Sequence, residues 1–127
     1  MTKNDLGDLM IHNMKLRPEQ FDNIKYNNKI MEVRLNDKKR RQINVGDKIK
    51  FYRSPELSEF IIVKVKDISI FLTFKELYNE FPSSYFGYGS LDINKSLNRI
   101  YSIYTPEQEE KNGVIAIMFQ IDHQCIS

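Results

Sequence analysis

The stretch NNKIMEVRLNDKKRRQINVGDKIKF, residues 27–51, decides which fold the chain is expected to adopt. Apolar and polar residues alternate over residues 30–36, and this alternation predicts a β-strand because successive side chains of a strand point to opposite faces. The apolar positions of this strand face a core, while Glu32 and Arg34 share the opposite face. The sequence thus places two opposite charges side by side, as part of either a reactive site or a salt bridge.

A basic loop follows this strand. Residues 37–41 begin with an aspartate and continue with four cations, and Val45-Gly46-Asp47 is a turn signal before a second alternating stretch at residues 48–52. The simplest prediction from this order is a β-hairpin that joins residues 30–36 to residues 48–52. Its tip would carry the four cations, which are Lys38, Lys39, Arg40 and Arg41.

Lys29, Glu32 and Arg34, followed by the Gly-Asp turn, stand in an order that resembles the signature of the ASCH domain, the activating signal cointegrator homology family of the PUA-like superfamily. The family signature opens with a glycine two residues before the lysine, where this chain has Asn27. Asparagine adopts a positive φ more readily than other non-glycine residues, so the same turn is expected here. The resemblance covers roughly residues 14–121 and includes the stretches Thr73-Phe74-Lys75-Glu76 and Gly113-Val114-Ile115-Ala116-Ile117.

Strands and short helices are predicted in an irregular order, which favours a mixed α+β domain over a regularly alternating parallel sheet. The resemblance to the ASCH domain implies more, namely a small, mostly antiparallel, PUA-like β-barrel flanked by short helices. It also implies that the signature residues line a cleft between barrel and helices. Residues 1–13 are expected to form an N-terminal extension or short helix, and residues 14–127 the ASCH (PUA-like) domain.

The rest of the chain supplies further elements of this domain. Helices are expected at residues 18–27, 74–80, 91–101 and 106–112, and strands at residues 59–70 and 114–121. The last strand is a nearly continuous apolar run, so it should be buried on both faces and lie centrally in the sheet. Residues 82–90 form a loop rich in aromatics and glycine, which either stacks a base or packs onto the core. The lack of interleaved cations favours the core.

The composition is that of one domain in a reducing compartment. A chain of 127 residues is long enough to bury a core of its own without covalent staples. The single cysteine, Cys125, excludes an intrachain disulfide and a cysteine-based zinc cluster. His12 and His123 stand far apart without an acidic or histidine partner at ligand spacing, so neither a metal site nor a cofactor is expected.

Nothing in the sequence predicts a membrane partner. No apolar run approaches the roughly 20 residues that span a bilayer, and residues 1–13 lack the features of a signal peptide. A cytoplasmic protein is therefore expected, and the sequence leaves its oligomeric state open.

Charge is distributed unevenly along the chain. Residues 15–53 hold 12 lysines and arginines against 5 acidic residues, whereas residues 54–127 hold 6 against 10. The excess of cations in the first half is either solvated surface or a face that receives phosphates. Because it coincides with the segment that holds Lys29, Glu32 and Arg34, it favours a site for a phosphate-bearing ligand.

The first functional hypothesis is that the chain binds RNA or a nucleotide, as the resemblance to PUA-like proteins also implies. Arg34 offers a bidentate contact to a phosphate and Lys29 a point charge, while Glu32 orients both or accepts a hydrogen bond from a base. Tyr104 is a further candidate for the cleft, with packing in the core as its alternative. The loop cations would follow the backbone of the ligand, and they are Lys38, Lys39, Arg40 and Arg41.

The second hypothesis is a hydrolase that acts on a modified nucleoside, with Lys29 and Glu32 as catalytic residues. One branch of ASCH-like proteins comprises acetylcytidine amidohydrolases, which resemble this chain at the lysine and the arginine but have a threonine where Glu32 stands. A carboxylate there would keep Lys29 protonated, whereas a lysine base needs its pKa lowered by burial or by nearby cations. In that case Glu32 itself would activate a water molecule to attack an amide or an RNA phosphodiester, and no metal ion would be required.

A purely structural role is the alternative for each of these residues. Lys29 follows the helix predicted at residues 18–27 and would complement the negative end of its dipole. Lys29, Glu32 and Arg34 would also form an ion network that ties this helix to the strand. Exposed ion pairs contribute only about 0–1 kcal/mol, so stability alone is a weak reason for three charges on one face.

Overall fold

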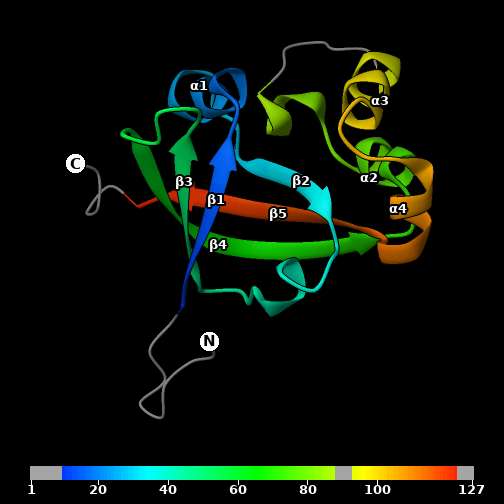
Figure 1. Ribbon diagram of the computed structural model, residues 1–127, viewed down its shortest axis with the longest axis horizontal. Coiled ribbons are helices and arrows are strands. Elements are labelled where there is room, and N and C mark those ends of the chain that lie inside the picture. The colour runs from blue at the N-terminus through cyan, green and yellow to red at the C-terminus, as the bar shows by residue number, and fades with distance from the viewer. Residues whose placement is uncertain (1–9, 88–92, 123–127) are drawn as a thin grey trace.

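The computed structural model describes residues 10–87 and 93–122 (Figure 1). The strands within these residues are β1 (Ile11–Leu16), β2 (Met31–Leu35), β3 (Lys48–Arg53), β4 (Phe60–Phe71) and β5 (Val114–Ile121). The α-helices are α1 (Pro18–Tyr26), α2 (Phe74–Glu80), α3 (Ile93–Tyr101) and α4 (Pro106–Asn112), and the 3-10 helices are η1 (Arg40–Gln42) and η2 (Ser83–Phe86). The predicted mixed α+β composition is confirmed.

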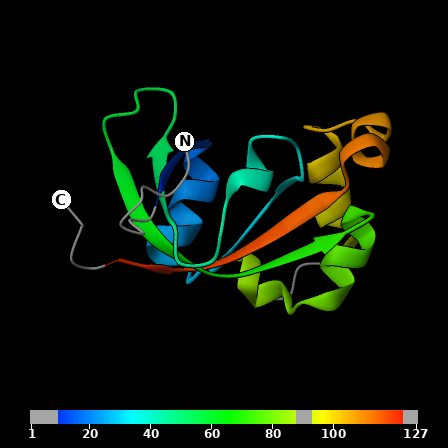
Figure 2. The same cartoon turned by 90° about the horizontal axis from the view of Figure 1, so that it is seen from below.

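The strands of the described residues form one curled sheet in the order β1-β3-β4-β5-β2. β1 and β3 are parallel, and the other neighbours are antiparallel. In Figure 1, α2, α3 and α4 gather around the end of the sheet where β4 ends and β5 begins, while α1 lies at the ends of β1 and β3. Figure 2 shows β4 and β5 along the base of the curl, with η1 on one side of them and α2 on the other. This mostly antiparallel half-barrel with short flanking helices has the architecture expected from the resemblance.

The edge strands of the half-barrel, β1 and β2, are joined by a side chain. Arg34 of β2 donates a hydrogen bond from Nη2 to the backbone carbonyl oxygen of Lys15 in β1, at 2.9 Å. Each of these strands has a ladder partner on its other edge, β3 for β1 and β5 for β2. The Arg34 guanidinium therefore joins the two edges of the curled sheet at this point, where β1 and β2 form no ladder with each other.

Two apolar clusters hold the sheet between its covering elements. The first lies inside the curl, where Ile117 and Phe119 of β5 pack with Phe21 of α1. The second lies on the opposite face, where Val114 and Ala116 of β5 pack with residues of α2 and α3. Because β5 contributes to both clusters and has a neighbour on each edge, its predicted two-sided burial inside the sheet is confirmed.

The hairpin predicted between residues 30–36 and 48–52 is wrong. β2 pairs with β5, with Glu32 opposite Ile117, and β3 pairs with β1 and β4. A strand buried on both faces needs hydrogen-bonding partners along both edges, and β2 fills the edge of β5 that β4 leaves open. The basic segment, residues 37–41, instead folds on itself, and Asp37 Oδ1 accepts a hydrogen bond from the backbone N–H of Arg40 at 3.0 Å.

β1 was not predicted as a strand. Its side chains alternate between exposed and buried, with His12, Met14 and Leu16 inward. A histidine at an inward position conceals this period-two pattern, since histidine does not count as apolar. β1 begins at Ile11, so the sheet includes residues that were expected in an N-terminal extension, while residues 1–9 lie outside the described residues.

The remaining elements follow their local signals. α2 begins after Thr73, whose side chain accepts a hydrogen bond from the backbone N–H of Glu76, and α4 begins with a complete capping box at Thr105. In the aromatic loop, Phe86 packs on Tyr78 with ring centroids 5.0 Å apart, as expected of a loop that packs on the core. The part of this loop at residues 88–90 lies outside the described residues. No helix in the described part of the chain has the length and apolar character needed to span a bilayer.

Candidate functional site

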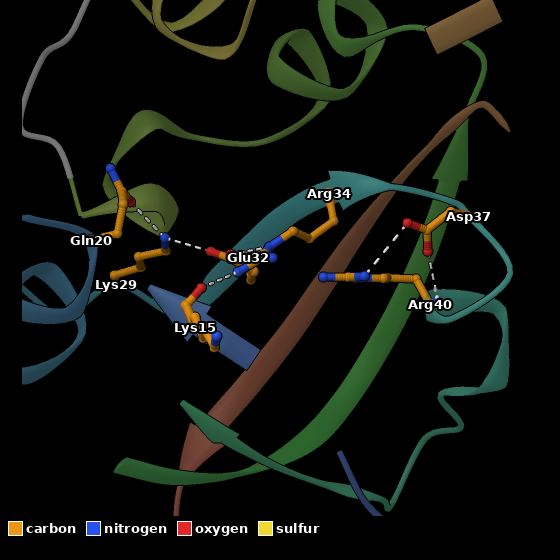
Figure 3. Close-up of polar contacts among 7 residues, drawn as sticks. All are labelled: Lys15, Gln20, Lys29, Glu32, Arg34, Asp37 and Arg40. Atoms are coloured by element: carbon orange, nitrogen blue, oxygen red, sulfur yellow. Dashed lines mark hydrogen bonds and ion pairs between the residues drawn. The ribbon is translucent and has the colours of Figure 1, made fainter. Parts of the chain in front are cut away.

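Lys29, Glu32 and Arg34 form one bonded network at the edge of β2 (Figure 3). Lys29 Nζ donates to Glu32 Oε1 at 2.7 Å, and Arg34 Nε donates to Glu32 Oε2 at 2.7 Å. Each oxygen of one carboxylate thus serves one cation. The period-two spacing of β2 places Glu32 and Arg34 on the same face, as the sequence predicts, and Lys29 joins them from the segment between α1 and β2.

Two further hydrogen bonds fix this network to neighbouring elements. Lys29 Nζ also donates to Gln20 Oε1 of α1, at 2.7 Å, and Arg34 Nη2 reaches Lys15 of β1. Lys29 and Arg34 therefore link α1 and β1 to one carboxylate of β2, that of Glu32. A lysine ammonium has three donors and a guanidinium has five. One N–H of Lys29 and the Nη1 group of Arg34 consequently have no protein partner within the described residues.

Burial makes the charges of the network strongly interdependent. The side chains of Lys29, Glu32 and Arg34 are 4%, 6% and 15% exposed. Burial by itself raises the pKa of Glu32, but the charges and hydrogen bonds of the two cations outweigh it and lower this pKa to about 2. Burial lowers the pKa of Lys29 below its ordinary value despite the opposing carboxylate. The pKa of Arg34 is raised, because Glu32 more than offsets the effect of burial.

The backbone turn before Lys29 has its left-handed residue at Asn28, with φ of 58°, whereas Asn27 has φ of −119°. The expected position of the turn residue, Asn27, is thus wrong by one. Gly87 packs against the same region with φ of 86°. A Cβ there would lie 2.8 Å from Asn23 Cβ and 3.1 Å from Lys29 Cβ, so glycine is required for the loop after η2 to approach Lys29.

A cavity of about 270 Å³ opens onto the network. It lies between the strand edges and the helices, with Gln20 of α1 on one side and Arg99 of α3 on the other. Among the described residues, five cations and two carboxylates line it, against an apolar background that includes Phe86 and Ile100. Such a mixture of apolar walls and a few convergent polar groups is typical of small-ligand sites.

The structure separates the remaining predicted site residues into three groups. Tyr104 lines the cavity and also stacks on Phe74 of the core, with centroids 5.7 Å apart and an interplanar angle of 16°. Lys39 and Arg40 line a second cavity of about 390 Å³, which shares Arg34 and Lys15 with the first. Lys38 and Arg41 are exposed and line neither of these two cavities.

Sequence reasoning missed several cavity residues. Lys15 and Arg17 lie in the cation-rich stretch at residues 15–53, but no sequence pattern predicts that β1 lies close to β2. Gln20 stands next to Phe21 on the buried face of α1, and a polar residue at such a position is the signal that points to it. Arg99 comes from a helix remote in sequence, and no local pattern connects it to the site.

His12 has an acidic partner that is remote from it in the sequence. Its Nε2 lies 2.8 Å from Oδ2 of buried Asp47, 35 residues away, and Asp47 also accepts a hydrogen bond from the backbone N–H of Asn44. This pair ties β1 to the turn before β3. Among residues 10–87 and 93–122, no group of three or more histidine, cysteine or acidic side chains is arranged to hold a metal ion.

Comparison with known proteins identifies what the chain is similar to. The family model of the ASCH domain matches residues 14–122. The crystal structure of hypothetical protein PH0355 matches with 34% sequence identity and a TM-score of 0.78, over 89% of this chain and 100% of that one. The solution structure of protein PF0455 from Pyrococcus furiosus matches with 32% identity and a TM-score of 0.69, over 88% and 97%. No curated protein matches the sequence.

Proposed function

The chain belongs to the ASCH domain family, and from this premise we propose that it binds RNA or a nucleotide, with one base or nucleoside in the cavity beside Lys29, Glu32 and Arg34. One observation carries the proposal. Three charged side chains are buried together at a cavity, and the two cations among them, Lys29 and Arg34, retain N–H donors that no described protein group uses. A buried ion network adds little stability compared with apolar packing, so a ligand is the better explanation for its position.

The dimensions of the cavity favour a small part of a nucleic acid. Ligand pockets commonly have volumes of roughly 300–1,000 Å³, and this one, at about 270 Å³, is near the lower limit. It suits a single base or nucleoside and excludes a duplex. The surplus of three cations among its described charged lining residues favours an anionic ligand, and the N–H groups of Arg34 and Lys29 are suited to a phosphate or a base carbonyl.

Binding should be tested by titration with the four nucleoside monophosphates and with a short single-stranded RNA. Lys15 has an exposed side chain at the cavity, and only its backbone oxygen bonds to Arg34. Lys15→Gln should therefore weaken binding about three- to tenfold without unfolding the chain. Lys75→Gln, on the exposed face of α2, is the charge-matched control and should have no effect.

Salt dependence provides a second test of the same titration. If about four cations neutralise phosphates of a single strand, the logarithm of the affinity should fall with the logarithm of salt concentration at a slope of roughly −3. A flat salt response, or equal binding by wild type and Lys15→Gln, would contradict a phosphate-binding cavity.

A second candidate, hydrolysis of an acylated nucleoside, is favoured by the lowered pKa of Lys29. A lysine base requires such a shift. Glu32 is poorly suited to act as the base, because its pKa is about 2 and both of its oxygens accept hydrogen bonds from cations. Release of acetate from acetylated cytidine, with a pH profile that rises below the ordinary pKa of lysine, would support this candidate. If the wild-type protein released no more acetate than Lys29→Met, hydrolysis would be excluded.

A further inference from the structure

We propose that the second cavity is a binding subsite for the neighbouring nucleotide of a single-stranded RNA whose first base occupies the cavity at Lys29. This inference rests on the proposed function and specifies its ligand as a strand rather than a free nucleotide. The second cavity, of about 390 Å³, lies between β1, β2, β3 and the basic segment. Its charged lining residues in the described chain are all cations, namely Lys15, Arg34, Lys39 and Arg40.

The two cavities are connected by shared residues. Lys15 and Arg34 line both of them and are hydrogen-bonded to each other. A backbone phosphate placed beside these two residues would have a base on either side, one in each cavity. The bridge that closes the half-barrel thereby becomes the point at which a strand crosses from the first subsite to the second.

Arg40 is held at the second cavity with part of its hydrogen-bonding capacity unused. Its backbone N–H bonds to Asp37 Oδ1 at 3.0 Å, but its Nη1 lies 3.5 Å from Asp37 Oδ2, at the limit of a hydrogen bond. Its Nε is buried and has no partner within the described residues, while its side chain is 14% exposed. In the described part of the chain, the Arg40 guanidinium at the cavity has only this long contact to Asp37, so a phosphate oxygen bound to its Nη groups would add a charge-assisted hydrogen bond.

Tyr52 gives the second cavity an aromatic wall. In the sheet it stands between Lys15 of β1 and Phe60 of β4, and its ring centroid is 6.2 Å from that of Phe60. Lys50 Nζ lies over both rings, at 5.2 Å from Tyr52 and 4.1 Å from Phe60. Cations interleaved with aromatic rings on an exposed sheet face are the pattern of proteins that bind single strands, because bases stack on the rings while cations attract the backbone.

This pattern distinguishes RNA from an acidic peptide as the ligand. An acidic peptide would satisfy the cations, but it would make no use of the Tyr52 ring. The sequence of residues 82–90 has no cation, and the described part of this loop packs on the core through Phe86. On β3, Lys50 and Tyr52 share the face opposite the buried Phe51. The stacking surface is thus expected on β3 and not in the aromatic loop.

The test compares a mononucleotide with a single-stranded tetranucleotide on wild type, Tyr52→Leu and Lys39→Gln. Leucine preserves apolar contact with Phe60 but removes the stacking ring, and Lys39 is exposed, so both variants should fold. Tyr52→Leu should weaken tetranucleotide binding about tenfold. Lys39→Gln should weaken it several-fold and make the salt slope shallower by about 0.7. Mononucleotide binding should be unchanged in both, and Lys75→Gln should match wild type throughout.

The possible results separate the two proposals. A tetranucleotide that binds no more tightly than the mononucleotide, or that is unaffected by both variants, overturns the second subsite and leaves the first intact. Tetranucleotide binding that depends on Tyr52 and Lys39, without mononucleotide binding, supports the second subsite and contradicts the first. Equal competition by hexaglutamate assigns the surface to acidic peptides and overturns the RNA proposal. If neither nucleotide probe binds, both proposals fail.

Discussion

Glu32 is the side chain on which the site depends, because one carboxylate neutralises two cations that are themselves buried. Glu32→Gln should lower the free energy of unfolding by about 3–5 kcal/mol at neutral pH, since it leaves Lys29 and Arg34 without their counter-charge. Urea denaturation measures this change. Glu80→Gln, at an exposed position of α2, is the control and should change stability by less than about 0.5 kcal/mol.

The same carboxylate predicts how stability responds to acid. The pKa of Glu32 falls from an ordinary 4.5 to about 2 on folding, so the stabilisation is complete above pH 4.5 and is lost as pH falls toward 2. A shift of this size corresponds to about 3 kcal/mol. Comparing wild type with Glu32→Gln between these pH values should show the difference in stability shrinking with acid. A difference that stays constant would contradict the buried ion network.

Local spacing predicts only part of this residue-level geometry. Glu32 and Arg34 share a face because a strand has period two, and Lys29 precedes the strand, so their meeting could be predicted from the sequence alone. The turn residue was placed one position early, since Asn27 and Asn28 have the same chemistry and only the backbone distinguishes them. Gln20 and Arg99 enter the site through packing between elements, which no local pattern records.

Among the elements, the segment between β2 and β3 differs most from its prediction. The sequence predicts the same role for its four cations, but Lys39 and Arg40 line the second cavity while Lys38 and Arg41 do not. The double variant Lys39→Gln/Arg40→Gln should therefore weaken RNA binding and make the salt slope shallower by about 1.4. Lys38→Gln/Arg41→Gln removes the same charge and should change the slope much less. Equal effects of the two pairs would favour a diffuse basic loop over a defined subsite.

The strand pairing explains why the structure of this segment differs from its prediction. A turn signal between two alternating stretches indicates a hairpin, but it does not show whether one of these strands pairs better with a third strand. β2 pairs instead with β5, which begins nearly 80 residues later, because β5 is buried on both faces and needs a neighbouring strand on each edge. The two-sided burial of β5 could be predicted from its apolar run, whereas its choice of β2 as neighbour depends on how the entire sheet curls.

Across the chain as a whole, Arg34 links the two ends of the sheet to the proposed ligand site. Its guanidinium bonds Glu32 on its own strand and the carbonyl of Lys15 on the opposite edge strand. Arg34→Lys keeps the charge but loses the planar fork that reaches both partners. The free energy of unfolding should fall by about 1.5–3 kcal/mol, the usual range for a hydrogen bond to a charged group. Arg53→Lys, whose partner Asp22 is partly exposed at 3.4 Å, should lose only about 0–1 kcal/mol.

Hydrogen exchange shows whether this loss is local to the closure. If Arg34 holds the edges together, amides of β1 should exchange much faster in Arg34→Lys, while those of β4 and β5 should follow only the global change in stability. RNA binding should weaken in parallel, because both cavities share the bridge. A uniform increase across all strands would mean that Arg34 supports the core in general. Unchanged β1 exchange would mean that the half-barrel keeps its curl without the guanidinium, and that Arg34 is retained for the ligand alone.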